Sequence, residues 1–478
     1  MRRGLIYSLS SNVIFFVSGY VLHFFLGNTM SAINYGVVGT IITVLDFEYM
    51  FLSNGARQSL SKEISMKRYS TLSVIAKTIA FQLIVIAFFF VINFFGAPIF
   101  GYVLNDSSLD FYFRVAAFLV PANGFFVILL GINDGLRQFG ISALLGVIYP
   151  IAKLSAVPLV VFPFRDKPVV GVEIGFLLAL LVSIVIGIIM LVATKGRIKT
   201  KSAGPIAFST VAKNTLSFSF FFIVVSLVLS VDTLVVKSVV RPARMAGYYT
   251  GAVNFGKIAY YLMSAFVTVI LPVVSHLVGE GKKDKAVTKA REITIVSLAF
   301  ILPIAVIVSA SSNLLLVAFY GDEYAASAGA LSCLALSNFF MGMTVMLNMV
   351  LNAHNSSHFS DVLSIASLIV VIPLFIVSAR TGGITAIAMT SMICTAILMI
   401  ASFIRVRHVV ANVMSATAWK AVVAAVILGL CTYGIDSILP RLSLIMVAIL
   451  YIAIYAVYMA VLYFAKIITP SLIRSLAA

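Results

Sequence analysis

The sequence predicts an all-α polytopic membrane protein. Of its 478 residues, 62% are hydrophobic and only 10% are charged, and the mean hydropathy is +1.13. Soluble domains are about half apolar and about a quarter charged, so a water-soluble fold could not bury this excess. Long apolar stretches recur along the whole chain, and short segments between them hold most of the basic residues. The composition therefore excludes the soluble, disordered and collagen-like classes of protein.

The apolar stretches predict about 14 transmembrane helices, because a helix needs about 20 apolar residues to cross the hydrocarbon core. The first stretch, Leu5 to Leu26, follows Arg2 and Arg3 like a signal peptide. It is longer than the usual apolar region of about 7–15 residues, so we expect a retained helix. The expected spans lie near residues 5–27, 35–53, 74–95, 111–131, 141–162, 170–193, 213–236, 248–275, 293–318, 325–351, 360–378, 383–403, 417–435 and 443–465.

The distribution of basic residues predicts how these spans are oriented. The chain has 33 Lys+Arg against 16 Asp+Glu, a formal net charge of +17. If the N-terminus is inside, cytoplasmic segments hold basic residues in an excess of roughly three to one over outer segments. We therefore expect both termini to be cytoplasmic and the chain to lie in the cytoplasmic membrane. The positive charge then serves orientation and anionic lipid headgroups rather than nucleic acid.

Local matches indicate that the chain contains a duplication. Ile132-Asn133 and Val157-Pro158-Leu159 recur, in the same order and at a similar offset, as Leu351-Asn352 and Ile372-Pro373-Leu374. A repeat of six helices gives two copies of the same orientation, an architecture found in transporters with a substrate site between the halves. The expected domains are a six-helix bundle at 1–200, a second six-helix bundle at 205–408, and two additional helices at 417–466.

Several short segments also resemble a known family. They are Tyr35-Gly36, Gly55-Ala56-Arg57, Val231-Asp232-Thr233-Leu234, Ala246 to Ala252, Leu271 to Ser275, and Gly382 to Ala388. Together they resemble the O-antigen and lipid-linked-oligosaccharide flippase branch of the multidrug/oligosaccharidyl-lipid/polysaccharide exporter superfamily, over nearly the whole chain. The resemblance implies a V-shaped pair of six-helix bundles that work by alternating access. In the related lipid II flippases two extra C-terminal helices form a groove for the lipid tail, and the last two expected spans would take that place.

Four basic residues are candidates for binding a phosphate or pyrophosphate group. Lys153 and Lys257 fall near the middle of their expected spans, where a charge costs about 2.5–3.5 kcal/mol on insertion scales. Two such cations facing a central cavity could hold the anion of a lipid-linked glycan. The alternative is structural ion pairs, Lys257 with Asp232 and Lys153 with an acidic residue of the second span. Arg57 and Arg114 either lie at the two mouths of the cavity or extend to the membrane interface.

Three acidic residues are candidates for ion coupling or for structural ion pairing. Asp46 and Glu48 are two residues apart, so on a helix they point about 200° from each other. Only one of them can face a central cavity, and the other must meet a neighbouring helix. A carboxylate there could bind H⁺ or Na⁺, and Asp232 is the third candidate. Coupling is not obligatory, because moving a negative charge outward across 100 mV releases about 2.3 kcal/mol.

Three functions compete for this sequence. The first is a flippase for a polyprenyl-(pyro)phosphate-linked oligosaccharide, with membrane lipids and H⁺ or Na⁺ as further partners, working as a monomer. The second is a cation-coupled multidrug antiporter of the same superfamily. The third, a membrane glycosyltransferase or glycan polymerase, lacks an outer loop long enough for an active site. Cys333, Cys394 and Cys431 lack the spacing of metal ligands, so we expect no metal, no cofactor and no catalytic residue.

Overall fold

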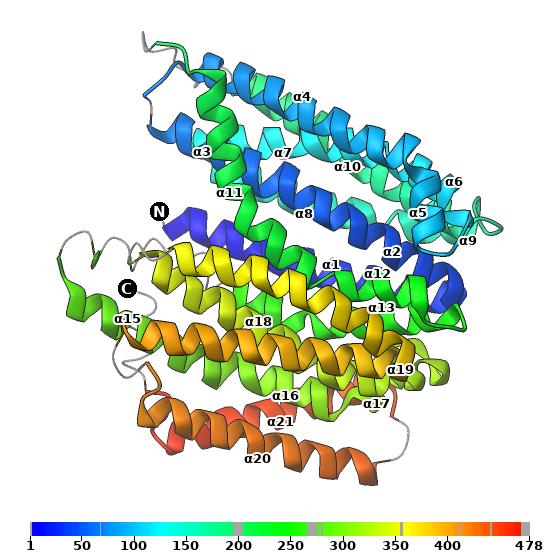
Figure 1. Ribbon diagram of the computed structural model, residues 1–478, viewed down its shortest axis with the longest axis vertical. Coiled ribbons are helices and arrows are strands. Elements are labelled where there is room, and N and C mark those ends of the chain that lie inside the picture. Colours follow the sequence, from blue (N-terminus) through cyan, green and yellow to red (C-terminus); the bar gives the residue numbers. More distant parts are fainter. Residues whose placement is uncertain are drawn as a thin grey trace. The chain divides into compact units, whose positions relative to one another are not determined.

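The computed structural model describes residues 2–66, 68–194, 204–264, 274, 277–278, 281–353, 357–410, 413–439 and 442–469. Throughout these ranges the chain forms helices joined by short turns, with no strand (Figure 1). The predicted all-helical class is therefore confirmed. The chain divides into two compact units, Met1–Gly247 and Tyr248–Ala478, and the long helices of each unit run alongside one another.

The first unit, here called the N-unit, runs from α1 to α12. Its elements are α1 (Arg2–Thr29), α2 (Ala32–Tyr49), η1 (Met50–Gly55), α3 (Ala56–Met66), α4 (Thr71–Phe95), α5 (Ala97–Val103), α6 (Ser108–Ala116), α7 (Leu119–Gly135), α8 (Phe139–Lys153), α9 (Ala156–Val161), α10 (Pro168–Ala193), α11 (Phe208–Val228) and α12 (Val231–Val239). Helix α13 (Arg244–Gly256) crosses the boundary between the units.

The second unit, the C-unit, repeats the order of the middle of the N-unit and adds two helices. Its further elements are α15 (Lys283–Val296), η3 (Ser297–Ile301), α16 (Leu302–Ala310), α17 (Ser312–Tyr320), η4 (Asp322–Ser327), α18 (Ala328–Ala353), α19 (Ser357–Arg407), α20 (Ala416–Ile438) and α21 (Leu444–Phe464). Thr71 and Lys283 open corresponding helices, as do Phe139 and Ser357. The duplication itself stays a prediction.

Helix breaks fall where the backbone chemistry requires them. Helix α19 contains non-helical residues at Gly382 and Gly383, and Gly383 has a φ of 62°. This left-handed conformation is open to glycine at little cost, so α19 consists of two helices joined by a tight turn. The sequence had placed a boundary between spans at the same point. In the N-unit, η1 is a π-helical segment, and Gln82 Nε2 of α4 donates a 3.1 Å hydrogen bond to its Leu52 carbonyl.

Three serines cap the N-termini of membrane-length helices. The side chains of Ser31, Ser415 and Ser443 accept backbone hydrogen bonds at the starts of α2, α20 and α21. Each serine satisfies one of the N–H groups that the first turn of a helix leaves without an intrahelical partner. Since such groups are costly to leave unbonded near an apolar medium, the caps fix where these helices begin.

The described part of the chain contains ten helices that are long and apolar enough to cross a membrane, and a shorter apolar helix at Val13–Thr29. This supports the polytopic class, while the number of about 14 spans stays a prediction. The expected span 213–236 is interrupted, because α11 ends at Val228 and α12 starts at Val231. Residues 265–273 of the expected span 248–275, and the basic segment 195–201, lie outside the described residues.

The packing unit extends beyond the boundary that the duplication predicts near residue 200. Helix α11 packs on η1, α3 and α4, and α12 packs on α2. A core cluster joins Leu60, Phe81 and Ile128 to Val211 of α11. A unit of packing need not coincide with a unit of duplication, so the bundles at 1–200 and 205–408 stay predictions.

Candidate functional site

A large cavity in the described part of the C-unit is an apolar groove along α20. Its volume is about 1000 Å³, and residues of α16, α18, the second half of α19 and α20 line it. Most of the lining side chains are aliphatic, aromatic or methionine, including Phe339, Met343, Met399, Phe403 and Leu430. A groove of this size and character accommodates a long apolar chain rather than a charged or sugar-like molecule.

The two ends of the groove differ from its middle. Arg407 and Trp419 lie at the end where α20 begins, and Tyr433 lies near the other end. Tyr433 is 14 positions after Trp419, which corresponds to about 21 Å of helix. A tryptophan and an arginine at one end are typical of a membrane–water interface, where the indole and guanidinium can meet polar headgroups.

A second, polar pocket adjoins the groove at the Tyr433 end. Its volume is about 430 Å³, it shares Ala310, Ser312 and Tyr433 with the groove, and Asp322 and Asp436 contribute to its lining. The Tyr451 hydroxyl of α21 donates to the Asp436 carboxylate, with oxygen distances of 3.0 and 3.2 Å. The combined cavity therefore changes from apolar to polar along α20.

Close helix contacts set the wall of the groove. A Cβ atom built on Gly429 of α20 would lie 2.5 Å from Val306 Cγ1 of α16, so only glycine allows this approach. The Tyr455 hydroxyl of α21 donates a 3.1 Å hydrogen bond to the Phe300 carbonyl of η3. Both contacts hold the last two helices against α16 and η3, which explains why the groove has a defined shape.

The N-unit contains two acidic side chains on α2, Asp46 and Glu48, within its helix packing. Glu48 of α2 is 2% exposed, and its Oε1 accepts a 2.6 Å hydrogen bond from Asn93 Nδ2 of α4. Asp46 is half-buried, and its charge acts on Lys153 and Tyr149 of α8. The two carboxylates thus face different helices, as their spacing predicts.

Lys153 at the end of α8 rests on aromatic rings. Its Nζ lies 3.9 Å from the ring centroid of Phe176 on α10 and 5.7 Å from that of Tyr149. A cation over a ring face is attracted by the ring quadrupole, by about 2 kcal/mol or more when desolvated. The two rings and the nearby Asp46 are therefore the groups that surround the Lys153 ammonium group.

Both candidate arginines form ion pairs within the N-unit. Arg57 Nε lies 2.7 Å from Asp134 Oδ2 of α7, and the Arg57 side chain is 38% exposed. Arg114 Nε lies 2.7 Å from Asp110 Oδ1 one turn earlier on α6, and its guanidinium stacks on Phe94 at 5.7 Å. Each arginine is thus positioned by a carboxylate and keeps part of its side chain accessible.

Asp232 belongs to the N-unit and Lys257 to the C-unit. Asp232 opens α12, is 3% exposed, and its Oδ1 accepts a 2.6 Å hydrogen bond from the Thr233 backbone. Lys257 follows α13 and is half-buried. Within the described part of the C-unit, no hydrogen bond or ion pair engages its ammonium group. Its role as an anion ligand stays a prediction.

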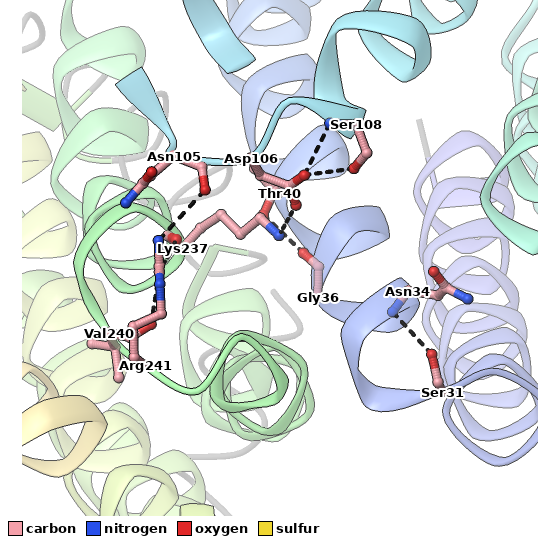
Figure 2. A network of polar contacts seen from close by, with 10 residues as sticks. All are labelled: Ser31, Asn34, Gly36, Thr40, Asn105, Asp106, Ser108, Lys237, Val240 and Arg241. Atoms are coloured by element: carbon pink, nitrogen blue, oxygen red, sulfur yellow. Dashed lines mark hydrogen bonds and ion pairs between the residues drawn. The ribbon is translucent and has the colours of Figure 1, made fainter. Parts of the chain in front are cut away.

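A polar network, here called the clasp, joins the α5–α6 turn to the end of α12 (Figure 2). Lys237 Nζ lies 2.6 Å from Asp106 Oδ2, and the Lys237 side chain is 3% exposed. Ser108 donates to Asp106 Oδ1 through its hydroxyl and its backbone N–H. The Arg241 guanidinium donates to the backbone carbonyl of Asn105. Burial raises the pKa of Asp106, but hydrogen bonds from Lys237 and Ser108 and the lysine charge outweigh it, so this pKa is lowered.

The sequence interpretation expected a groove at the last two spans only through the family resemblance, and it missed the clasp. The groove depends on which faces of four helices meet, and the clasp joins residues that are 131 positions apart. It also left Glu173 out of the candidate site. A local signal for this residue existed, because Glu173 is the only charged residue in the 26 residues of α10.

Comparisons with known proteins agree with this architecture. A family model described as polysaccharide biosynthesis protein matches residues 1–278, and the MatE family model matches residues 218–377. No curated protein matches the chain.

Solved structures with the same fold include a flippase and two transporters. The lipid II flippase MurJ in an inward closed conformation has 16% identity and a TM-score of 0.70, over 98% of this chain and 100% of that chain. An inward-facing multidrug resistance MATE family transporter has 15% identity and a TM-score of 0.67, over 86% and 100%. A transporter from Pyrococcus furiosus, described as having a binding pocket of reverse polarity, has 14% identity and a TM-score of 0.62, over 86% and 96%.

The predicted relationship to the multidrug/oligosaccharidyl-lipid/polysaccharide exporter superfamily is therefore confirmed. Since its family model matches more than half of the 478 residues, the chain belongs to the polysaccharide biosynthesis protein family.

Proposed function

We propose that the protein is a flippase, which moves a polyprenyl-(pyro)phosphate-linked oligosaccharide across the cytoplasmic membrane by alternating access. It acts as a transporter and not as an enzyme, with about 14 spans, cytoplasmic termini and a single chain as the working unit. The apolar groove of the C-unit carries this proposal, because it suits the polyprenyl tail of such a substrate.

The energetics of the tail explain what the groove contributes. A prenyl chain gains little by leaving lipid for an apolar groove, because lipid is equally apolar. The groove therefore does not supply affinity; it gives the tail a continuous apolar surface while the head group crosses. The adjoining polar pocket and the Arg407–Trp419 end offer polar surroundings at both ends of this path.

The charged head group needs cationic residues, and the N-unit and Lys257 supply them. We assign phosphate binding to Lys153 and Lys257, with Arg57 and Arg114 placed by their carboxylate partners to receive the anion. Outward movement of a doubly charged pyrophosphate across 100 mV releases about 4.6 kcal/mol. Asp46, Glu48 and Asp232 are the residues proposed to bind a coupling ion.

The direct test is transport in proteoliposomes. A fluorescent polyprenyl-pyrophosphate glycan is presented to the wild type and to Lys257→Ala, and its binding and transbilayer movement are measured. We expect movement by the wild type and its loss in the variant. Unaltered movement by Lys257→Ala would remove this lysine from the site, and no movement by the wild type would contradict the flippase.

A cation-coupled multidrug antiporter is the second candidate, supported by the MatE match over residues 218–377. The two functions predict opposite variants, because an antiporter depends on acidic residues and Asp46→Asn would abolish dye efflux. The fold comparison favours the flippase, since MurJ covers 98% of the chain and the MATE transporter covers 86%.

A further inference from the structure

Glu173 is a buried acidic side chain without a hydrogen-bond partner. It lies in the second turn of α10 and is 4% exposed. Neither carboxyl oxygen has a hydrogen-bond partner in the part of the chain that the structure describes. A buried polar atom is nearly always bonded, so two orphan oxygens on one carboxyl group require an explanation.

Glu173 lines a small cavity whose other lining residues are all apolar. The cavity measures about 10 Å³ and lies between α2, the start of α7 and α10. Apart from Glu173, its lining consists of apolar residues, among them Val38, Ile41, Leu119 and Phe176. An ionised carboxylate enclosed in this way would lose its hydration and gain no compensating bond.

The titratable groups of the neighbouring helices form no bond that would compensate an ionised Glu173 for its lost hydration. Helix α10 packs on α2, α6, α7, α8 and α9, and α9 has no titratable residue. The others carry Tyr35, Asp46, Glu48 and Tyr49 on α2, Asp110, Tyr112 and Arg114 on α6, Asp134 on α7, and Tyr149 and Lys153 on α8. None of them bonds to Glu173. The ammonium group of Lys153 rests on Phe176, one turn along α10 from Glu173.

The size of the cavity decides which ligand the carboxyl group can hold. A cavity needs roughly 10–15 Å³ of accessible volume to hold one water molecule, so there is no room for a hydrated cation. Sodium or another metal ion would also need several oxygen ligands, whereas the other side chains of this lining carry none. A proton needs neither space nor further ligands.

We propose that Glu173 is a proton-binding site that locks α2 against α10. In the packing described here the carboxyl group is neutral. Its proton is taken from bulk water and returned to it, and the ionised form is tolerated only when water reaches the side chain. Deprotonation therefore requires that the contact of Val38, Ile41 and Leu45 with α10 opens. Protonation of Glu173 thus couples to a movement of α2. The proton site is independent of the proposed function; only the use of this movement in transport rests on that function.

The bound proton is tested first, without any substrate. Infrared difference spectra of the purified full chain and of Glu173→Gln are compared at about pH 7. We expect the wild type to show a protonated-carboxyl band that Glu173→Gln lacks. If the two spectra agree in this band, Glu173 is ionised in the closed packing and the proposal is overturned. The result does not depend on whether the protein moves a glycan.

The lock is tested by amide hydrogen exchange in α2 and α10. Glu173→Gln cannot ionise and has the same intrinsic exchange chemistry, so it is the reference at each pH. We expect wild-type exchange near Glu173 to match the variant at about pH 5 and to exceed it about tenfold at about pH 9. Glu48→Gln, which removes the buried acid of α2, should keep this pH response. Equal exchange of wild type and Glu173→Gln at every pH would refute the lock.

Discussion

The two units share an order of helices but differ in what their interiors contain. The N-unit buries ionisable side chains, with Glu48 bonded to Asn93, Lys153 on Phe176 and Lys237 on Asp106. The C-unit instead encloses an apolar groove of about 1000 Å³ beside α20. Since charge inside a membrane is costly and an apolar groove is not, the N-unit must use specific partners, whereas the C-unit needs shape alone. Under the proposed function, this difference corresponds to a division of labour between the charged head group and the apolar tail of the substrate.

The largest effect is expected from filling the groove. Val426→Trp places an indole in it and should slow glycan transport about tenfold or more, because the bulky ring obstructs the path of the tail. The matched control is Val423→Trp on the same helix; Val423 is 56% exposed and Val426 is 54% exposed, but only Val426 lines the groove. The control should stay within about twofold of the wild type. Equal transport by the two variants would show that the groove is not used.

The clasp of the N-unit should show the largest loss of stability. Asp106→Asn leaves the buried Lys237 ammonium unpaired and should lower the free energy of unfolding by about 3 kcal/mol. Unfolding in mixed micelles with increasing denaturant measures the change. Asp110→Asn, four residues along, removes a half-exposed pair with Arg114 and should cost at most about 1 kcal/mol. Similar losses in both variants would mean that the burial of Lys237 has no energetic importance.

The clasp also predicts a pH dependence with a definite sign. The pKa of Asp106 is lowered from its ordinary value of 3.8 in the folded protein. The clasp therefore contributes its full stability above that ordinary value and loses it as the pH falls through the lowered pKa. The difference in unfolding free energy between the wild type and Asp106→Asn should be constant from neutral pH to about pH 5 and shrink in stronger acid. A difference that grows on acidification would contradict the ion pair.

The smallest effect is expected at the start of α20, which a local cap stabilises. Ser415 accepts a 3.2 Å hydrogen bond from the Ala418 backbone, so Ser415→Ala should cost about 1 kcal/mol in unfolding free energy. Ser437→Ala near the end of the same helix serves as the control and should change it by less than about 0.5 kcal/mol. No difference between these variants would show that packing against α16 alone fixes the helix.

Hydropathy could predict the helices but not the partners of their charged residues. The expected span 170–193 agrees closely with α10, Pro168–Ala193, because apolar length is a local property. The turn at Gly382 and Gly383 was equally visible, since glycine alone favours the backbone conformation found there. The pairing of Lys237 with Asp106 and the isolation of Glu173 depend on helices distant in sequence. The even spacing of Asp46 and Glu48 predicted that they diverge, but not that Glu48 would meet Asn93.

The division of labour is tested most directly by locating the tail of the bound substrate. A polyprenyl-pyrophosphate glycan with a photoactivatable group in its prenyl chain is bound to the full protein, and the adducts are mapped by mass spectrometry. We expect adducts on groove residues such as Met399, Phe403 and Leu430, and their loss in Val426→Trp but not in Val423→Trp. Adducts confined to the N-unit, or spread evenly over the outer helix surfaces, would contradict the account.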